Sequence, residues 1–239
     1  KIKSDNIFNI LNPVYNSRLD NNSILSKNYS LKNTLFFNRF SSTFSSDFNF
    51  VKDNFKNNLI YSNDIQNSLN KILNIRFQLF RKVYSIISVT DGRKKYYSQY
   101  MPERNFYIKN NHVEPSINFN VNNNQRLGFI YRMSQKNNIY SREKTVINKL
   151  SIEYQQNIMI KTNITGKFSY ANIKSQTAGE TSVAYELFEG LSKGVNYILN
   201  LSYEKTISSN TKLYFNYEGR KNVNTKIIQT VSVQFKMFF

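Results

Sequence analysis

From Thr230 to Met237 the chain alternates between polar and apolar side chains, and it then ends on two aromatic residues, Phe238 and Phe239. One face of an extended strand would carry Val231, Val233, Phe235, Met237 and Phe239. The other would carry Thr230, Ser232, Gln234 and Lys236. A period of two predicts a strand with one face in an apolar environment. Soluble domains usually end in polar, poorly ordered residues, whereas a strand that closes a transmembrane barrel keeps its apolar face in lipid. The ending therefore predicts a membrane barrel.

The same alternation recurs through the second half of the chain, with turn residues such as Asn122-Asn123-Asn124 and Ser208-Ser209-Asn210 between the segments. With the terminal strand we expect eight strands there. The others are 113–121, 126–133, 150–155, 158–170, 183–187, 196–204 and 212–220.

The first half has a weaker pattern, in which we expect strands at 29–40, 44–51, 69–79 and 83–89, the last running toward a turn at Asp91-Gly92. Helical spacing of apolar residues also fits 64–90, and the β-branched and aromatic residues of 83–89 favour strands. Residues 1–28 and 52–66 lack periodicity and are expected to be loop or terminal segment. We therefore expect about twelve strands, with 1–28 as a loop or connecting segment and 29–239 as the barrel.

Three features favour a transmembrane barrel over a soluble sandwich. Several predicted strands approach the ~9–11 residues that a tilted strand needs to cross the hydrocarbon. Gly and Pro, which sandwiches use at corners, number only 7 and 3. Tyr and Phe cluster near strand ends, as in interfacial girdles. The mean hydropathy of −0.54 fits a barrel, since only alternate residues face lipid. In lipid such strands must close into an antiparallel up-and-down barrel.

The formal net charge is +18, from 33 Lys and Arg against 15 Asp and Glu. Such a balance is also typical of nucleic-acid-binding proteins, so a ribosomal-type protein from an AT-rich genome is the alternative. The basic residues are scattered rather than clustered in an arm, and Lys, Asn, Ile, Tyr and Phe, which have AT-rich codons, are inflated together. We therefore expect no nucleic-acid partner. There is no Cys, which excludes disulfides and thiolate metal sites.

The terminal strand resembles the C-terminal signal by which bacterial outer-membrane proteins are recognised for insertion. The stretches 184–191, 193–197 and 217–221 resemble the ends of large outer-membrane barrel proteins of Bacteroidota, and the likeness covers roughly residues 100–239. It implies the bacterial outer membrane, with its lipid, the barrel-assembly machinery and other subunits of an envelope complex as partners. The chain begins without Met, so either a signal has been removed or, as we expect, the sequence is a C-terminal piece of a longer chain. Members of this group act in transport, secretion and assembly, and no residue here selects among these.

One departure concerns the connectors. Such barrels alternate short periplasmic turns with long external loops. Counting strands back from the C-terminus places the long connectors 134–142 and 172–180 at the end that should carry short turns.

Charged residues on the polar face of the strands are the candidate functional residues. They form either a salt-bridged filling that stiffens the barrel or a selectivity lining for a polar or anionic solute. The predicted lumen-facing charges are Glu114, Arg132, Glu153, Lys161, Lys167, Glu186, Glu204, Glu218, Arg220 and Lys236. The predicted insertion signal is Val233, Phe235, Met237 and Phe239.

No catalytic, metal or cofactor site is predicted. His112, the one histidine, is expected near the barrel rim just before a strand, and no nucleophile motif accompanies it. The basic run 92–95 is expected in a solvated loop, with contact to a lipopolysaccharide phosphate as the alternative. The sequence thus predicts a non-catalytic outer-membrane barrel that acts as a pore, a scaffold or a membrane anchor.

Overall fold

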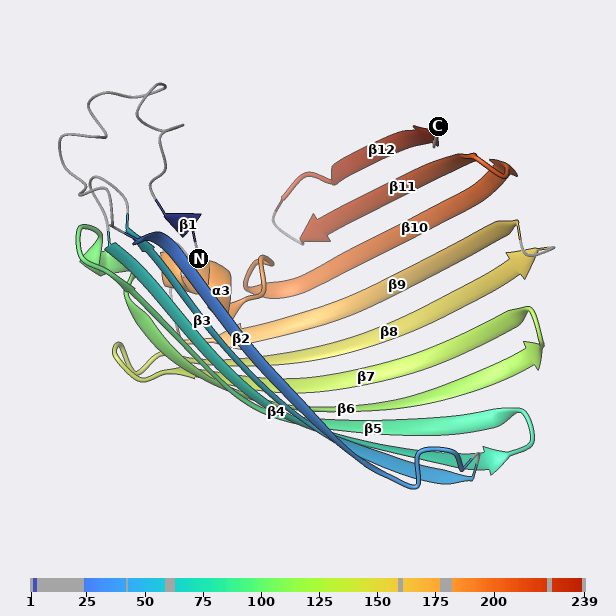
Figure 1. The fold of residues 1–239 in the computed structure, drawn as a ribbon, viewed down its shortest axis with the longest axis horizontal. Coiled ribbons are helices and arrows are strands. Elements are labelled where there is room, and N and C mark those ends of the chain that lie inside the picture. Colours follow the sequence, from blue (N-terminus) through green and yellow to red (C-terminus); the bar gives the residue numbers. More distant parts are fainter. Residues whose placement is uncertain are drawn as a thin grey trace.

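The computed structural model describes residues 2–3, 24–41, 43–58, 63–158, 161–176, 182–222 and 225–237. These residues form one antiparallel sheet whose spatial order follows the chain order (Figure 1). The strands are β1 (Ile2–Lys3), β2 (Ile24–Phe37), β3 (Phe44–Asn58), β4 (Asn63–Phe80), β5 (Val83–Ser98), β6 (Phe106–Asn122), β7 (Gln125–Asn138), β8 (Lys144–Ile158), β9 (Thr162–Ser175), β10 (Gly194–Ser208), β11 (Thr211–Asn222) and β12 (Ile228–Met237). This confirms the predicted up-and-down all-β fold.

The sheet is strongly curved, and a short helix, α3 (Ser182–Leu187), lies on its concave side (Figure 1). We call the face toward α3 the inner wall and the opposite face the outer wall. Because successive side chains of a strand point to opposite faces, the cross-strand register assigns each residue to a wall. The outer wall carries exposed apolar residues on every strand from β2 to β12, among them Leu35, Phe129, Leu201 and Val233. The inner wall is mainly polar, as expected of a barrel whose outside faces lipid.

The two ends of the sheet differ in their connectors. Short turns at 81–82, 123–124 and 209–210 lie at one end, which we call the turn end. Residues 139–143, a 3-10 turn η1 (Pro102–Arg104) and α3 lie in connectors at the opposite end, the loop end. None of the described helices is long and apolar enough to cross a membrane.

The expected strand at 183–187 is wrong. These residues form α3, in which Val183, Ala184 and Leu187 are buried while Tyr185 is 71% exposed. Alternate residues therefore do not share an environment, and the burial follows the i, i+1, i+4 spacing of a helix face. When this strand is removed from the count, the two long connectors, 134–142 and 172–180, both lie at the loop end. The departure from the usual alternation of turns and loops disappears with it.

Other boundaries also differ from expectation. The helical alternative for 64–90 is wrong, because β4 and β5 pair along almost their whole length. Residues 52–58 and 63–66, expected to be loop, continue β3 and β4, and β2 starts at Ile24, inside the segment expected to be a connection. The expected Asp91-Gly92 turn lies within β5, where Gly92 pairs with Asn70 and Asn110. Here a Cβ would lie 2.6 Å from the Asn70 side-chain oxygen, so the lack of a side chain permits the close approach.

Candidate functional site

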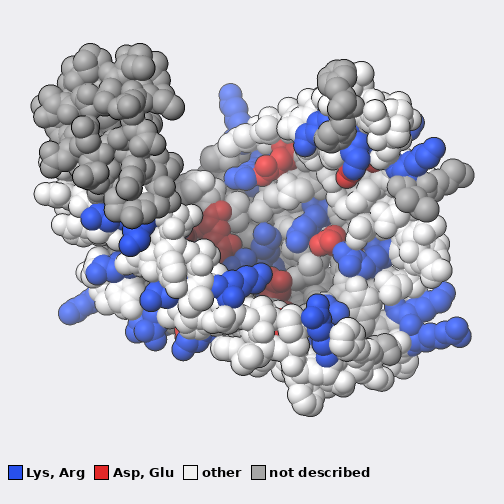
Figure 2. Space-filling view, viewed as in Figure 1, with Lys and Arg blue, Asp and Glu red and all other residues white. Residues whose placement is uncertain are grey.

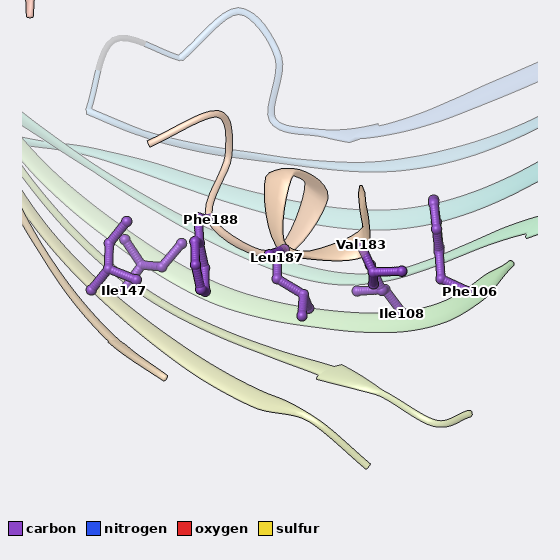
Figure 3. Close-up of a cluster of buried hydrophobic side chains, with 8 residues drawn as sticks. Phe106, Ile108, Ile147, Val183, Leu187 and Phe188 are labelled. Atoms are coloured by element: carbon purple, nitrogen blue, oxygen red, sulfur yellow. The ribbon is translucent and has the colours of Figure 1, made fainter. Parts of the chain in front are cut away.

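The segment 182–191, which contains α3 and which we call the α3 segment, is packed into the inner wall at the loop end. Its buried side chains meet buried apolar side chains of β6, β8 and β9 (Figure 3). The cluster consists of Phe106, Ile108, Ile147, Ile173, Val183, Ala184, Leu187 and Phe188. Full burial of one large apolar side chain contributes about 1.5–3 kcal/mol. Apolar contact is therefore the main force that holds the segment against the wall.

The backbone after α3 turns sharply back toward the wall. Glu189 and Gly190 both have positive φ, 59° and 75°. The Phe188 amide donates to the Ala184 carbonyl at 2.8 Å, and the Gly190 amide donates to the Tyr185 carbonyl at 2.9 Å. This left-handed ending is a common helix C-cap, for which glycine is well suited. It directs the Glu189 carboxylate toward cations of the inner wall.

Ion pairs complete the docking of the segment. Glu189 lies 3.0 Å from Arg132 and 3.3 Å from Lys136, both on β7. Glu186 lies 2.9 Å from Lys94 on β5, and Lys136 also donates to the Glu186 backbone carbonyl at 3.0 Å. A carboxylate of the segment therefore meets each of three wall cations. Figure 2 shows basic and acidic side chains together in the hollowed centre of this face.

The pKa of the Glu189 carboxyl is lowered below its ordinary value of 4.5. Burial acts to raise this pKa, but the charges of Lys136 and Arg132, with a smaller contribution from Lys149, outweigh it. Glu189 is therefore ionised at neutral pH, which keeps its ion pairs intact.

A second set of inner-wall charges lies outside the docking region. Arg126 and Lys167 flank Glu153, at 3.4 and 3.6 Å. Lys212 lies 3.2 Å from Glu204, and Arg220 pairs with Glu218. Lys236 lies with its ammonium 4.9 Å from the Tyr214 ring centre. These pairs join neighbouring strands or lie along one strand, so they do not involve the α3 segment.

The predicted lumen-facing residues separate into three groups in the structure. Glu114, Arg132, Glu153, Lys167, Glu204, Glu218, Arg220 and Lys236 lie on strands at inner-wall register. Glu186 lies on α3 rather than on a strand, and Lys161 lies in the turn before β9. Arg132 and Glu114 approach to 3.9 Å.

Sequence reasoning missed Lys136 and Glu189, which are central to the docking. Lys136 falls within the predicted connector 134–142, and Glu189 follows the predicted strand 183–187. The signal for Lys136 was present, since Arg126, Arg132 and Lys136 keep one parity along β7. No period-two pattern could have found Glu189, because its position depends on a helix and its cap.

A hollow of about 420 Å³ lies on the inner wall at the turn end. Its lining includes Arg76 on β4, Arg81 and Lys82 in the turn after it, and Tyr84 and Arg126. Lys82 donates to the Val121 carbonyl at 3.1 Å, and Arg126 pairs with Glu153. Arg76 and Arg81 make no ion pair with any residue that the structure describes. We call this the turn-end hollow, and its charge is cationic.

His112 lies in the middle of β6, opposite Thr90 and Ser134, so the expected rim position is wrong. Within the described ranges no group of three or more His, Cys, Asp or Glu side chains could hold a metal ion.

Three of the four residues in the predicted insertion signal lie exposed on the outer wall of β12. These are Val233, Phe235 and Met237, and Phe239 lies outside the described residues. Recognition of this strand by the barrel-assembly machinery stays a prediction.

No protein-family model and no curated protein matches the chain. Among solved structures, OmpTdeltaL8, a loop-deletion mutant of OmpT, an outer membrane protein of Vibrio cholerae, aligns with a TM-score of 0.51 and 7% identity. The alignment covers 90% of this chain and 99% of that one. The NanC porin aligns with a TM-score of 0.44 and 9% identity over 90% and 94% of the two chains. At such identities the likeness concerns the fold alone. The chain has the fold of a bacterial outer-membrane β-barrel.

Proposed function

We propose that this protein is a non-catalytic pore of the outer membrane, narrowed at one mouth by the α3 segment and selective for anionic solutes. In outer-membrane barrels short turns face the periplasm and longer loops face outward. By this rule the α3 segment lies at the external mouth. The turn-end hollow then lies at the periplasmic mouth.

The observation that carries the proposal is the state of the cations in the turn-end hollow. A charge removed from water without a partner is very costly. Arg76 and Arg81 are exposed and have no ion-pair partner among the described residues. Arg76 on the inner wall and Arg81 in the adjoining turn therefore require solvation by water, which supports a water-filled lumen at this mouth. Unpaired cations along such a lumen favour anions.

Conductance measurements test this proposal. The full chain is folded from denaturant into detergent, checked by heat-modifiable gel mobility, and inserted into a planar bilayer between unequal KCl solutions. We expect stable conductance steps and a reversal potential of the sign that chloride preference requires. Absence of steps both from the folded and inserted natural chain and from a folded variant with an undocked α3 segment would refute the pore. A reversal potential that shows potassium preference would refute the anion selectivity.

A structural anchor is the second candidate, and the buried cluster around Leu187 favours it. A cluster of large, fully buried side chains that joins β6, β8 and β9 to α3 stiffens the wall and fills part of the lumen. If neither the natural chain nor a variant with an undocked α3 segment conducts, the anchor is the better account.

A further inference from the structure

The outer wall carries a cluster of basic side chains at the loop end of β2 to β6. These side chains, which we call the basic belt, are Lys27, Lys52, Lys56, Arg93, Lys95 and Lys109. All six are exposed. No member of the belt makes an ion pair with another described residue. The belt therefore has charge to offer to a partner outside the chain.

The register places the belt in adjoining rows. Lys52, Leu69, Arg93 and Lys109 are successive cross-strand partners on β3, β4, β5 and β6. One step nearer the loop end, Asn54, Asn67, Lys95 and Tyr107 form the next row. Strands lie about 4.8 Å apart. Arg93 and Lys95 both lie on the outer face of β5, and Lys52 lies two strands away on β3. The three side chains therefore share one area of the outer wall.

Two hollows open in this area. The larger, about 480 Å³, is lined by Lys52, Arg93 and Lys95 together with Leu69 and Tyr107. The smaller, about 260 Å³, is lined by Lys27 and Lys56 with Tyr29 and Ile65. Asn54 and Asn67 line both. Each hollow therefore combines cations, amide groups and apolar side chains, which suits an anionic head group joined to hydrocarbon.

The height of the belt matches the head-group region. On β6 the outer wall is apolar from Val113 to Val121, nine positions that approach the ~9–11 needed to cross the hydrocarbon. Lys109 lies four positions beyond Val113, toward the loop end. One row nearer the hydrocarbon than the belt, Lys71 on β4 is the cross-strand partner of Asp91 on β5. The cation nearest the hydrocarbon therefore has a carboxylate beside it. Cations are costly at mid-bilayer and tolerated near the interface.

We propose that the basic belt binds the phosphate groups of lipopolysaccharide in the outer leaflet, with one phosphate of its lipid A in each hollow. Arg binds phosphate oxygens through two parallel N–H donors, and each Lys or Arg near an anionic membrane surface adds attraction. The aromatic and aliphatic residues of the hollows contact the upper parts of the acyl chains. The inference depends on the outer-membrane location and on the loop end facing outward, and not on the pore.

Binding of purified lipid A to the full chain, folded in neutral detergent, tests the proposal. Native mass spectrometry gives the apparent Kd for bis-phosphorylated lipid A, for its dephosphorylated form and for phosphatidylglycerol. We expect the bis-phosphorylated form to bind on the order of 100-fold more tightly than the dephosphorylated one. Equal binding of the two forms would overturn the phosphate site. Equal binding of phosphatidylglycerol would overturn the assignment to lipopolysaccharide.

The matched variants carry the same charge change at two places on the outer wall. In the belt variant, Lys52→Ser, Arg93→Ser and Lys95→Ser are combined, and we expect affinity for lipid A to fall by on the order of 100-fold. The control combines Lys144→Ser, Lys174→Ser and Lys221→Ser, which lie outside both hollows, and should bind like the natural chain. Arg93→Ser alone, expected to weaken binding about fivefold, replaces the triple variant if that does not fold. Unchanged affinity for lipid A in a folded belt variant would overturn the site. Conductance is measured without lipid A, so this outcome would leave the test of the proposed pore unchanged.

Discussion

Lys94, Arg132 and Lys136 at the loop end of the inner wall each lie within 3.3 Å of a carboxylate of the α3 segment. Arg76 and Arg81 at the turn end face an open hollow and have no ion-pair partner among the described residues. A charge on the inner wall must be stabilised either by a counter-charge or by water. The loop end has counter-charges for its cations, whereas the cations of the turn end are exposed to solvent. In the proposed pore, this difference would give a lumen that is narrowed by the α3 segment at one mouth and open to solvent at the other.

The largest expected effect comes from undocking the α3 segment. Leu187 is fully buried, with 0% of its surface exposed. Truncating such a residue to Ala costs about 2–5 kcal/mol, and Leu187→Asp adds an unpaired buried charge. We expect the segment to leave the wall, which would remove the difference between the two mouths and raise the single-channel conductance.

Tyr185→Asp is the matched control, because Tyr185 is on the same helix and is mostly exposed. It should leave the conductance near that of the natural chain. Equal conductance in the natural chain and in folded Leu187→Asp would show that the segment does not limit the pore.

The next effect compares the two walls at one height. Leu201→Arg places a charge on the apolar outer wall and should cost about 2–4 kcal/mol at mid-bilayer depth. Ser202→Arg, one residue along β10, places the same charge on the polar inner wall and should be tolerated. Unfolding by urea in lipid vesicles measures both. Equal costs would mean that both walls pack against protein, contrary to the lipid assignment.

The strands were predictable where the outer wall is apolar. From Phe129 to Met133 on β7, or Leu199 to Tyr203 on β10, each outward residue is apolar or aromatic, so the alternation of hydropathy follows the alternation of the backbone. The pattern fails where the outer wall leaves the hydrocarbon. On β3 the outward residues Lys52, Asn54 and Lys56 are polar, so the sequence pattern predicts a loop although the backbone stays paired.

The candidate site was predictable only in part. The inward charges on strands follow from parity, which assigns Arg132 and Glu153 to the same wall as Ser134 and Ser151. The contacts of Glu186 and Glu189 depend on α3, whose residues 183–187 happen to alternate like a strand. Its helix is stabilised by packing into the wall, and such long-range packing leaves no periodic trace in a six-residue segment.

Removing one carboxylate tests the ionic part of the docking. Glu189→Gln loses its attraction to Arg132 and Lys136, which leaves two cations with weaker partners and should cost about 1–3 kcal/mol. We expect the Glu189→Gln channel to show brief openings of larger conductance, and we expect these openings to be less frequent than in Leu187→Asp. Glu204→Gln, which removes the partner of Lys212 elsewhere on the wall, is the control. A similar rate of openings in both variants would show that the effect is not specific to the α3 segment.

Acid should open the narrowed mouth through the same carboxyl. The folded-state pKa of Glu189 is lower than 4.5, so its ion pairs stabilise the docked segment at any pH above this value. That stabilisation is lost as the pH falls through the lower, folded-state pKa. Conductance should therefore stay constant down to about pH 4.5 and rise below it. Glu189→Gln should remove this rise, and a rise that begins well above pH 4.5 would assign it to another group.

The smallest expected effect concerns selectivity at the turn end. Arg76→Ser together with Arg81→Ser removes the two cations of the turn-end hollow that have no ion-pair partner among the described residues. Their action on an ion in a wet lumen is weak, since water screens it, and we expect the preference for chloride over potassium to fall roughly twofold. Lys205→Ser, at an outer-wall position of β10, should leave the preference unchanged. Because the Debye length shortens from about 8 Å at 0.15 M salt to about 3 Å at 1 M, the difference between natural chain and variant should shrink at high salt. A difference that persists at 1 M would indicate a direct binding site for the anion rather than a long-range field.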